Sequence, residues 1–341
     1  MLIGVQYLRA VAASLVVVSH ITYLVPGGKW HFNGNFGVDI FFLISGFVIW
    51  VSGAKIPAGA FALRRIIRIV PIYWMVTLYA SLVDVRNGLE FGFWPETEDF
   101  LRSLLFIPYQ NAERGGDISP ILGVGWSLNL EMYFYALFTV GIFVARKHLL
   151  AFVVCILCLV PVLVNLGGTT DIIFAFYSRN ITLEFAGGMI LGATYVSRGQ
   201  LGGPIHGATA LFIAFALLAF APSVGFRAID SGVPAALILI AVIALEPLFR
   251  IRPQRWGVLL GDSSYSLYLL HGQVLFFFGP LVSMGLLPRI GWVTRPLAFV
   301  ACVLTAIALH LMFEKPATRL LRHMLARWKR NGDGTEARDR A

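Results

Sequence analysis

Two ionisable residues, Arg9 and His20, interrupt the apolar stretch that begins the chain. They are eleven positions apart, and at about 3.6 residues per turn this spacing brings a helix back to within about 20° of the same face. The two side chains would lie on one stripe, roughly 16 Å apart at about 1.5 Å per residue. If the stretch crosses a bilayer, one helix would present a cation near its start and a titratable base deeper in the membrane, where ionisable residues are costly and usually functional.

Asp39 lies near the start of the next apolar stretch, at a depth similar to that of His20 if the two stretches pack as antiparallel neighbours. A carboxylate on one ring nitrogen would fix the tautomer of His20 while the other nitrogen takes a proton from a hydroxyl group. The pair would then act as a general base. In the alternative interpretation, His20 bonds to a helix carbonyl and Asp39 caps its own helix.

A cluster of arginines follows the second apolar stretch, at Arg64, Arg65 and Arg68. On a helix Arg64 and Arg68 share a face, with Arg65 beside them. Guanidinium groups form bidentate bonds with phosphates, so the cluster suits a polyanionic ligand. Ordinary anchoring at the inner membrane interface, with contacts to lipid headgroups, is the alternative.

Further polar residues lie within later apolar stretches. Glu131 would sit near mid-membrane, where a carboxylate must be protonated, paired or hydrated. Pairing with Arg9 or His271 would make it structural, whereas a water-filled cavity would make it a substrate or proton-path residue. Ser264, Tyr268 and His271 share one helix face. That face should point to the protein interior, either lining a tunnel or bonding neighbouring helices.

The composition points to a membrane protein. Of 341 residues, 58% are hydrophobic and 13% are charged, whereas soluble domains carry about 25% charged residues. The net charge of +9 arises from Lys and Arg residues between apolar blocks, which argues against a nucleic-acid-binding surface. Cys155 and Cys158 lie within an apolar block and are interpreted as packing residues, and the histidines show no metal-ligand grouping, so no metal is expected.

The apolar blocks predict an all-α, polytopic membrane protein with about ten transmembrane helices. Basic residues fall mostly in alternate loops, which places both termini in the cytoplasm. We expect the first block to be a retained span and not a cleaved signal peptide. Residues 1–314 would form the transmembrane domain and 315–341 a basic cytoplasmic tail, whose first part is either an amphipathic helix on the inner leaflet or disordered. The expected spans are approximately 3–25, 36–54, 69–86, 119–145, 149–166, 180–197, 205–221, 233–249, 258–279 and 293–313.

Five motifs in order resemble the membrane-bound acyltransferase family 3, in particular its exopolysaccharide O-acetyltransferase branch. They are Arg9-x10-His20, Gly37-Val38-Asp39-x-Phe41-Phe42-x-x-Ser45-Gly46-Phe47, Arg64-Arg65-x-x-Arg68-x-x-Pro71, Trp126-Ser127-Leu128-x-x-Glu131 and Ser264-Tyr265-x-x-Tyr268-x-x-His271. The resemblance implies transfer of an acyl group, acetyl by default, from cytoplasmic acetyl-CoA to a carbohydrate hydroxyl. Many relatives carry a fused periplasmic domain, whereas this chain ends within about 27 residues of its last expected span, so its outer loops would select the acceptor.

The resemblance also implies roles for individual residues. His20 would be the catalytic base or the acyl acceptor and Arg9 its companion, with Asp39 and Glu131 as further catalytic residues. The residues expected to bind the donor are Arg64, Arg65, Arg68, Ser264, Tyr268 and His271. The expected location is the bacterial inner membrane. The expected partners are a carbohydrate acceptor and membrane lipids, with a homo-oligomer or polysaccharide-assembly proteins as further possibilities.

Two other functions fit buried charges among many spans. A transporter or flippase for a lipid-linked glycan or an acyl donor is the main alternative. The sequence has no matching pair of Gly/Pro-interrupted spans in two halves, which counts against it. A structural membrane subunit is the third possibility, and it would tolerate the loss of Arg9 or His20.

Overall fold

The protein is almost entirely helical. The computed structural model describes residues 2–24, 34–91, 96–168, 170–288 and 290–325, so the second half of the predicted tail lies outside the described residues. The α-helices are α1 (Ile3–Ile21), α2 (Phe36–Gly53), α3 (Ala58–Phe91), α4 (Thr97–Leu104), α5 (Trp126–Val144), α6 (Leu149–Gly167), α7 (Ile172–Tyr177), α8 (Leu183–Arg198), α9 (Pro204–Phe220), α10 (Val233–Ala244), α11 (Glu246–Ile251), α12 (Arg255–Asp262), α13 (Ser264–Ser283) and α14 (Gly291–Leu309).

The remaining elements are short. Strands β1 (Gln110–Asn111) and β2 (Asp117–Ile118) pair antiparallel in the loop before α5. Single turns of 3-10 helix cover Thr22–Leu24, Ala112–Arg114, Gly123–Gly125, Arg146–His148 and Asn180–Thr182, and π-helical turns cover Ala228–Gly232 and His310–Glu314.

The helices are long and apolar enough to cross a bilayer, within which a helix satisfies its own backbone hydrogen bonds. Seven helical stretches of the described chain meet that description, and Pro204–Phe220 and Ala228–Ala244 are shorter apolar helices. Together with α8, they supply one helix for each of the ten expected spans. The all-α, polytopic class is therefore confirmed, while the number of spans and the side on which the termini lie stay predictions.

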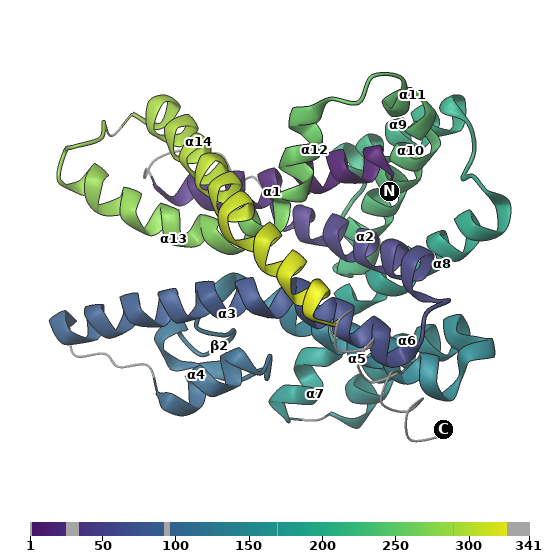
Figure 1. Ribbon diagram of the computed structural model, residues 1–341, viewed down its shortest axis with the longest axis horizontal. Coiled ribbons are helices and arrows are strands. Elements are labelled where there is room, and N and C mark those ends of the chain that lie inside the picture. Colours follow the sequence, from purple (N-terminus) through teal and green to yellow (C-terminus); the bar gives the residue numbers. More distant parts are fainter. Residues whose placement is uncertain (1, 25–33, 92–95, 169, 289, 326–341) are drawn as a thin grey trace, which may run out of the picture.

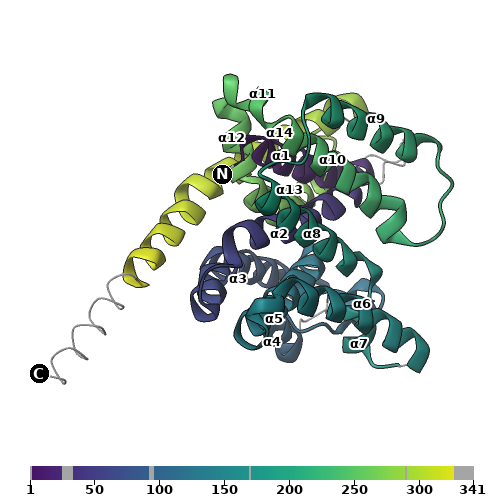
Figure 2. The same ribbon diagram turned by 90° about the vertical axis from the view of Figure 1, so that its right-hand side faces the viewer.

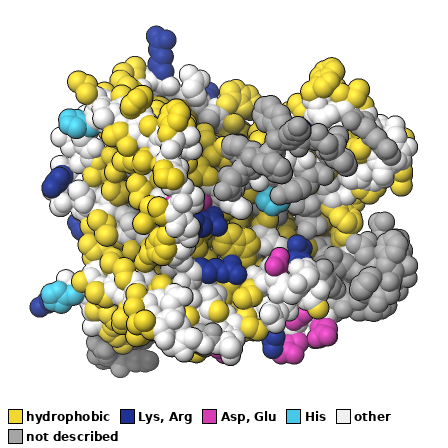
Figure 3. All heavy atoms as spheres, turned by 180° about the vertical axis from the view of Figure 1, so that it is seen from behind, with side chains coloured by type: hydrophobic (Ala, Val, Ile, Leu, Met, Phe, Trp, Pro, Cys, Tyr) yellow, Lys and Arg dark blue, Asp and Glu magenta, His cyan; other side chains and the backbone are white. Residues whose placement is uncertain are grey.

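The surface also suits a bilayer. Large apolar side chains such as Phe143, Phe220 and Leu166 are more than 80% exposed. Figure 3 shows one face that is mostly apolar, with basic side chains near its middle and acidic ones toward one edge. The last helix runs without a break from Gly291 to Leu325, past the predicted end of its span, and projects from the rest of the molecule in Figure 2.

Helix α2 is the central element that positions the site. In Figure 1, α1, α13 and α14 lie on one side of it and α3 to α7 on the other. It approaches α8 very closely, because a Cβ atom added at Gly46 would lie 2.2 Å from the carbonyl oxygen of Phe185, and one added at Gly188 would lie 2.1 Å from that of Leu43. Small residues permit such backbone contact between membrane helices. This packing fixes the depth of the polar residues that α2 carries.

Candidate functional site

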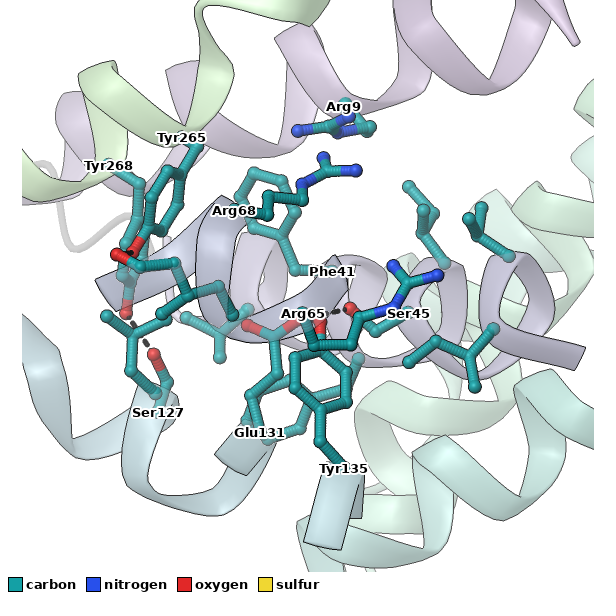
Figure 4. Close-up of a pocket in the computed structure, with 17 residues that line it drawn as sticks. Arg9, Phe41, Ser45, Arg65, Arg68, Ser127, Glu131, Tyr135, Tyr265 and Tyr268 are labelled. Atoms are coloured by element: carbon teal, nitrogen blue, oxygen red, sulfur yellow. Dashed lines mark hydrogen bonds between the residues drawn. The ribbon is translucent and has the colours of Figure 1, made fainter. Parts of the chain in front are cut away.

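A cavity of about 90 Å³ lies among α1, α2, α3, α5 and α13 (Figure 4). Three arginines and one glutamate line it, Arg9, Arg65, Arg68 and Glu131. We call it the arginine cavity. Arg9 comes from the first half of α1 and Glu131 from the second turn of α5, so residues far apart in the sequence meet at one place.

Two cations of the arginine cavity, Arg9 and Arg65, hydrogen-bond only to neutral side chains among the described residues. Arg9 donates to the Gln6 side chain at 3.3 Å, and Arg65 donates to Ser52 at 3.2 Å. The guanidinium groups of Arg9 and Arg68 face each other in Figure 4. Like charges so placed repel each other, and an anion between them would relieve the repulsion. The arrangement is therefore that of an anion-binding site.

Arg64 is absent from this arrangement. Its side chain is exposed, whereas Arg65 and Arg68 point inward. The predicted shared face of Arg64 and Arg68 does not form the cavity wall, since the wall of α3 is built from residues 65, 68 and 69.

Glu131 faces the same cavity. Its carboxylate accepts hydrogen bonds from Ser45, at 2.8 Å, and from the Tyr135 hydroxyl. Neither Arg9 nor His271, the two partners considered from the sequence, bonds to it in the described chain. Glu131 is thus a cavity residue held by two hydroxyl groups, and its negative charge partly balances the three arginines.

His20 lines a second, larger cavity of about 630 Å³, which we call the His20 cavity. Its Nδ1 lies 2.8 Å from the carbonyl oxygen of Val16. A carbonyl only accepts, so Nδ1 must carry the proton, and in the neutral ring Nε2 is left as an acceptor. This bond to a helix carbonyl is the one that the alternative interpretation expects, yet it leaves a basic nitrogen beside the cavity.

The predicted pair of His20 and Asp39 is wrong in this structure. Asp39 is fully buried and forms a bidentate ion pair with Arg227, with its two oxygens 2.8 and 3.1 Å from Nε and an Nη of the guanidinium. A second buried carboxylate, Glu184, lies beside Asp39. Arg227 and Glu184 were not predicted as site residues from the sequence. The only signal for Glu184 is an acidic residue inside an expected span.

The neighbour of His20 is instead His271, whose ring is edge-on to it with 4.8 Å between centroids. His271 is fully buried, and its Nδ1 lies 2.8 Å from the Tyr268 carbonyl oxygen. Its Nε2 has no hydrogen-bond partner among the described residues. His271 lines neither the arginine cavity nor the His20 cavity, and it packs against the ring of His20.

The two cavities meet at Val38 and Tyr268, which line both of them. The Tyr268 hydroxyl lies 2.7 Å from Ser127 Oγ and donates to the Val124 carbonyl at 3.0 Å, which holds the ring across the junction. Ser264, predicted on the same stripe, is elsewhere: its hydroxyl donates to the Gly261 carbonyl at 2.7 Å, and it is not a lining residue of either cavity.

Comparison with known proteins identifies a family. A profile described as "Acyltransferase domain" matches residues 2–312. "Exopolysaccharide production protein ExoZ" of Rhizobium meliloti (strain 1021) is 34% identical, over 85% of this chain and 91% of that protein. "Putative peptidoglycan O-acetyltransferase YrhL" of Bacillus subtilis (strain 168) is 24% identical, over 96% of this chain and 58% of that protein. "Acyltransferase MdmB" of Streptomyces mycarofaciens is 26% identical, over 84% of this chain and 82% of that protein. No solved structure matches.

Proposed function

The chain belongs to the acyltransferase domain family and is an O-acyltransferase, and from this we propose that it moves an acyl group, acetyl by default, from acyl-CoA to a hydroxyl of a surface polysaccharide precursor. The names of the relatives support the reaction type. The observation that carries the proposal is that an anion-binding cavity and a cavity with a basic imidazole nitrogen meet inside one helical bundle.

The arginine cavity is the proposed donor site. CoA carries several phosphate groups, and Arg9, Arg65 and Arg68 offer cations that no carboxylate in the described chain engages by a salt bridge. A volume of about 90 Å³ is too small for the whole molecule. We propose that the phosphates stay at the cavity mouth and that only the narrow pantetheine arm enters, toward Tyr268.

His20 is the proposed general base. Its Nε2 takes the proton of the acceptor hydroxyl while the oxygen attacks the thioester carbonyl. A C–O bond forms, the C–S bond breaks, and the proton passes from the imidazole to the departing CoA thiolate. The bond from Nδ1 to the Val16 carbonyl supports this role, because it holds the ring in the tautomer that leaves Nε2 free.

The test is the release of CoA thiol by the purified full chain, with acetyl-CoA and an acceptor oligosaccharide. His20→Asn keeps an N–H donor for the Val16 carbonyl and removes the base, so transfer should fall at least about a hundredfold. His206→Asn changes an exposed histidine of α9 and serves as the matched control. Thiol release that survives His20→Asn would refute the mechanism, and a transporter would release no thiol at all.

A covalent acyl-histidine is the alternative to direct transfer. Rapid mixing with labelled acetyl-CoA and no acceptor distinguishes the two, because only an acyl-enzyme leaves label on the chain. We propose direct transfer, so the wild-type chain should stay unlabelled.

A further inference from the structure

A third cavity, of about 650 Å³, adjoins the His20 cavity and shares Trp126 and Arg179 with it. We call it the Arg179 chamber. Two arginines line it, Arg179 and Arg227, and no carboxylate does. Its other polar residues are Asn165, Ser178 and Asn180. Amide and hydroxyl groups of this kind hydrogen-bond sugar hydroxyls, while the Arg179 guanidinium, which has no salt bridge within the described chain, gives the chamber a positive potential.

Arg179 is held in place by aromatic rings. Its guanidinium carbon lies 4.5 Å from the centroid of Phe176 and 5.8 Å from that of Trp126. Such stacking engages the faces of the guanidinium and leaves its N–H groups available at the edge. The side chain is partly buried and is therefore a fixed donor in the chamber wall and not a mobile surface cation.

The two arginines of the chamber differ in their partners. Arg227 is neutralised by Asp39. Arg179 has no salt bridge within the described chain, and Asp117, the nearby acid that lines the His20 cavity, lies beyond ion-pair distance. The pKa of Arg179 is lowered by burial and then by the charge of Arg227. Both effects mean that a bound anion would stabilise this cation.

We propose that the acceptor is an acidic saccharide, and that Arg179 binds its carboxylate or phosphate group while a hydroxyl of a neighbouring sugar reaches His20. The inference rests on the proposed function, because it names the substrate class of the same site. Arg179 and His20 line one cavity, so a single extended saccharide can contact both. Arg179 is then the residue that selects acidic over neutral acceptors.

The experiment compares three probes built on one tetrasaccharide: the neutral glucotetraose, the same chain with one unit oxidised to glucuronate, and the same chain with one phosphate monoester. Binding to the full chain in detergent is measured by calorimetry without acetyl-CoA, and thiol release is measured in parallel samples to which acetyl-CoA is added. For the wild type, at least one acidic probe should bind about tenfold more tightly than the neutral one, as expected for a charge-assisted hydrogen bond.

Arg179→Gln should reduce the ratio of the affinities for the acidic and neutral probes to about one. Arg179→Lys should retain part of the preference, because the positive charge remains but the planar guanidinium is lost. Arg102→Gln is the matched control, since Arg102 is an exposed arginine that pairs with Glu98 and is not among the lining residues of these cavities. Thermal unfolding verifies that each variant is folded. A preference for the glucuronate probe identifies a carboxylate, and a preference for the phosphate probe identifies a phosphate.

Equal binding of all three probes by the wild type, or an unchanged preference in Arg179→Gln, would overturn the inference. The proposed function fails separately, if no probe supports thiol release. Because binding is measured without acetyl-CoA, the preference for acidic over neutral probes can be determined whether or not thiol is released.

Discussion

The imidazole of His271 lies edge-on against that of His20, with 4.8 Å between the ring centroids, and it is completely buried behind it. One histidine borders the His20 cavity and the other is held by the backbone of its own helix. The pair therefore consists of an accessible ring and a supporting ring. The supporting role of His271 can be tested by substitutions that change the shape and the chemistry of its side chain separately.

His271→Phe keeps a planar ring of similar volume, whereas His271→Ala leaves a void beside His20. We expect His271→Ala to lower kcat at least tenfold and to destabilise the protein by about 2–4 kcal/mol, in the range of large-to-small changes in a core. His271→Phe should retain most of the activity, because packing is the proposed role. Thiol release and thermal unfolding measure both effects. Loss of activity in a stable His271→Phe protein would assign proton chemistry to His271.

The Asp39–Arg227 pair predicts a stability effect. Asp39→Ala removes the bidentate partner of Arg227, so the free energy of unfolding should fall by about 3 kcal/mol, the low end for buried pairs because Arg227 is partly exposed and Glu184 lies nearby. Asp39→Leu combined with Arg227→Met should recover much of the loss. The exposed Arg102–Glu98 pair is the control. Glu98→Gln should lower the free energy of unfolding by less than about 1 kcal/mol. Additive effects of the two changes at the buried pair would show that the residues do not interact.

The close contact of α2 and α8 predicts intolerance to a single methyl group. Gly188→Ala would place Cβ 2.1 Å from the Leu43 carbonyl oxygen, so the helices must separate and the yield of folded protein should fall sharply. Gly59→Ala on α3 is the matched control, because nothing lies within 4 Å of its added Cβ atom. It should be neutral or slightly stabilising, since alanine is the better helix former. Size-exclusion profiles and melting temperatures distinguish the two variants.

The arginine cavity predicts how the donor is recognised. The wild type should prefer acetyl-CoA to S-acetylpantetheine, which lacks the phosphates. Arg68→Gln should raise the KM for acetyl-CoA about tenfold and narrow that preference, as expected for a lost charge-assisted bond. Arg64→Gln should have a smaller effect, because Arg64 is exposed and does not line the cavity. Equal effects of the two variants would place the phosphates outside the cavity.

The helices, and the ionisable residues whose burial in a membrane is costly, could be predicted from the sequence. Apolar blocks of about twenty residues specify spans almost independently of their neighbours, because each helix satisfies its own backbone. Arg9, Glu131 and Arg68 stood out since each lies in or beside such a block, and the structure brings them to one cavity. Arg9 and His20 both lie on α1, as the first apolar block predicts.

Partners across helices were not predictable in the same way. Asp39 and Arg227 are 188 residues apart, and a similar depth in the membrane made His20 an equally good partner for Asp39. Arg64 and Arg65 differ by about 100° around a helix, and only the neighbouring helices decide which of them faces inward. Ser264 fits the spacing of the predicted polar stripe, but its hydroxyl donates a hydrogen bond to the Gly261 carbonyl.

The junction at Val38 and Tyr268 bears on the energetics of polysaccharide decoration. If the donor stays on one side of these residues and the acceptor on the other, only a small acyl fragment changes compartments. No pump, ion gradient or exported activated carrier is then needed, because the free energy of thioester cleavage alone drives the modification.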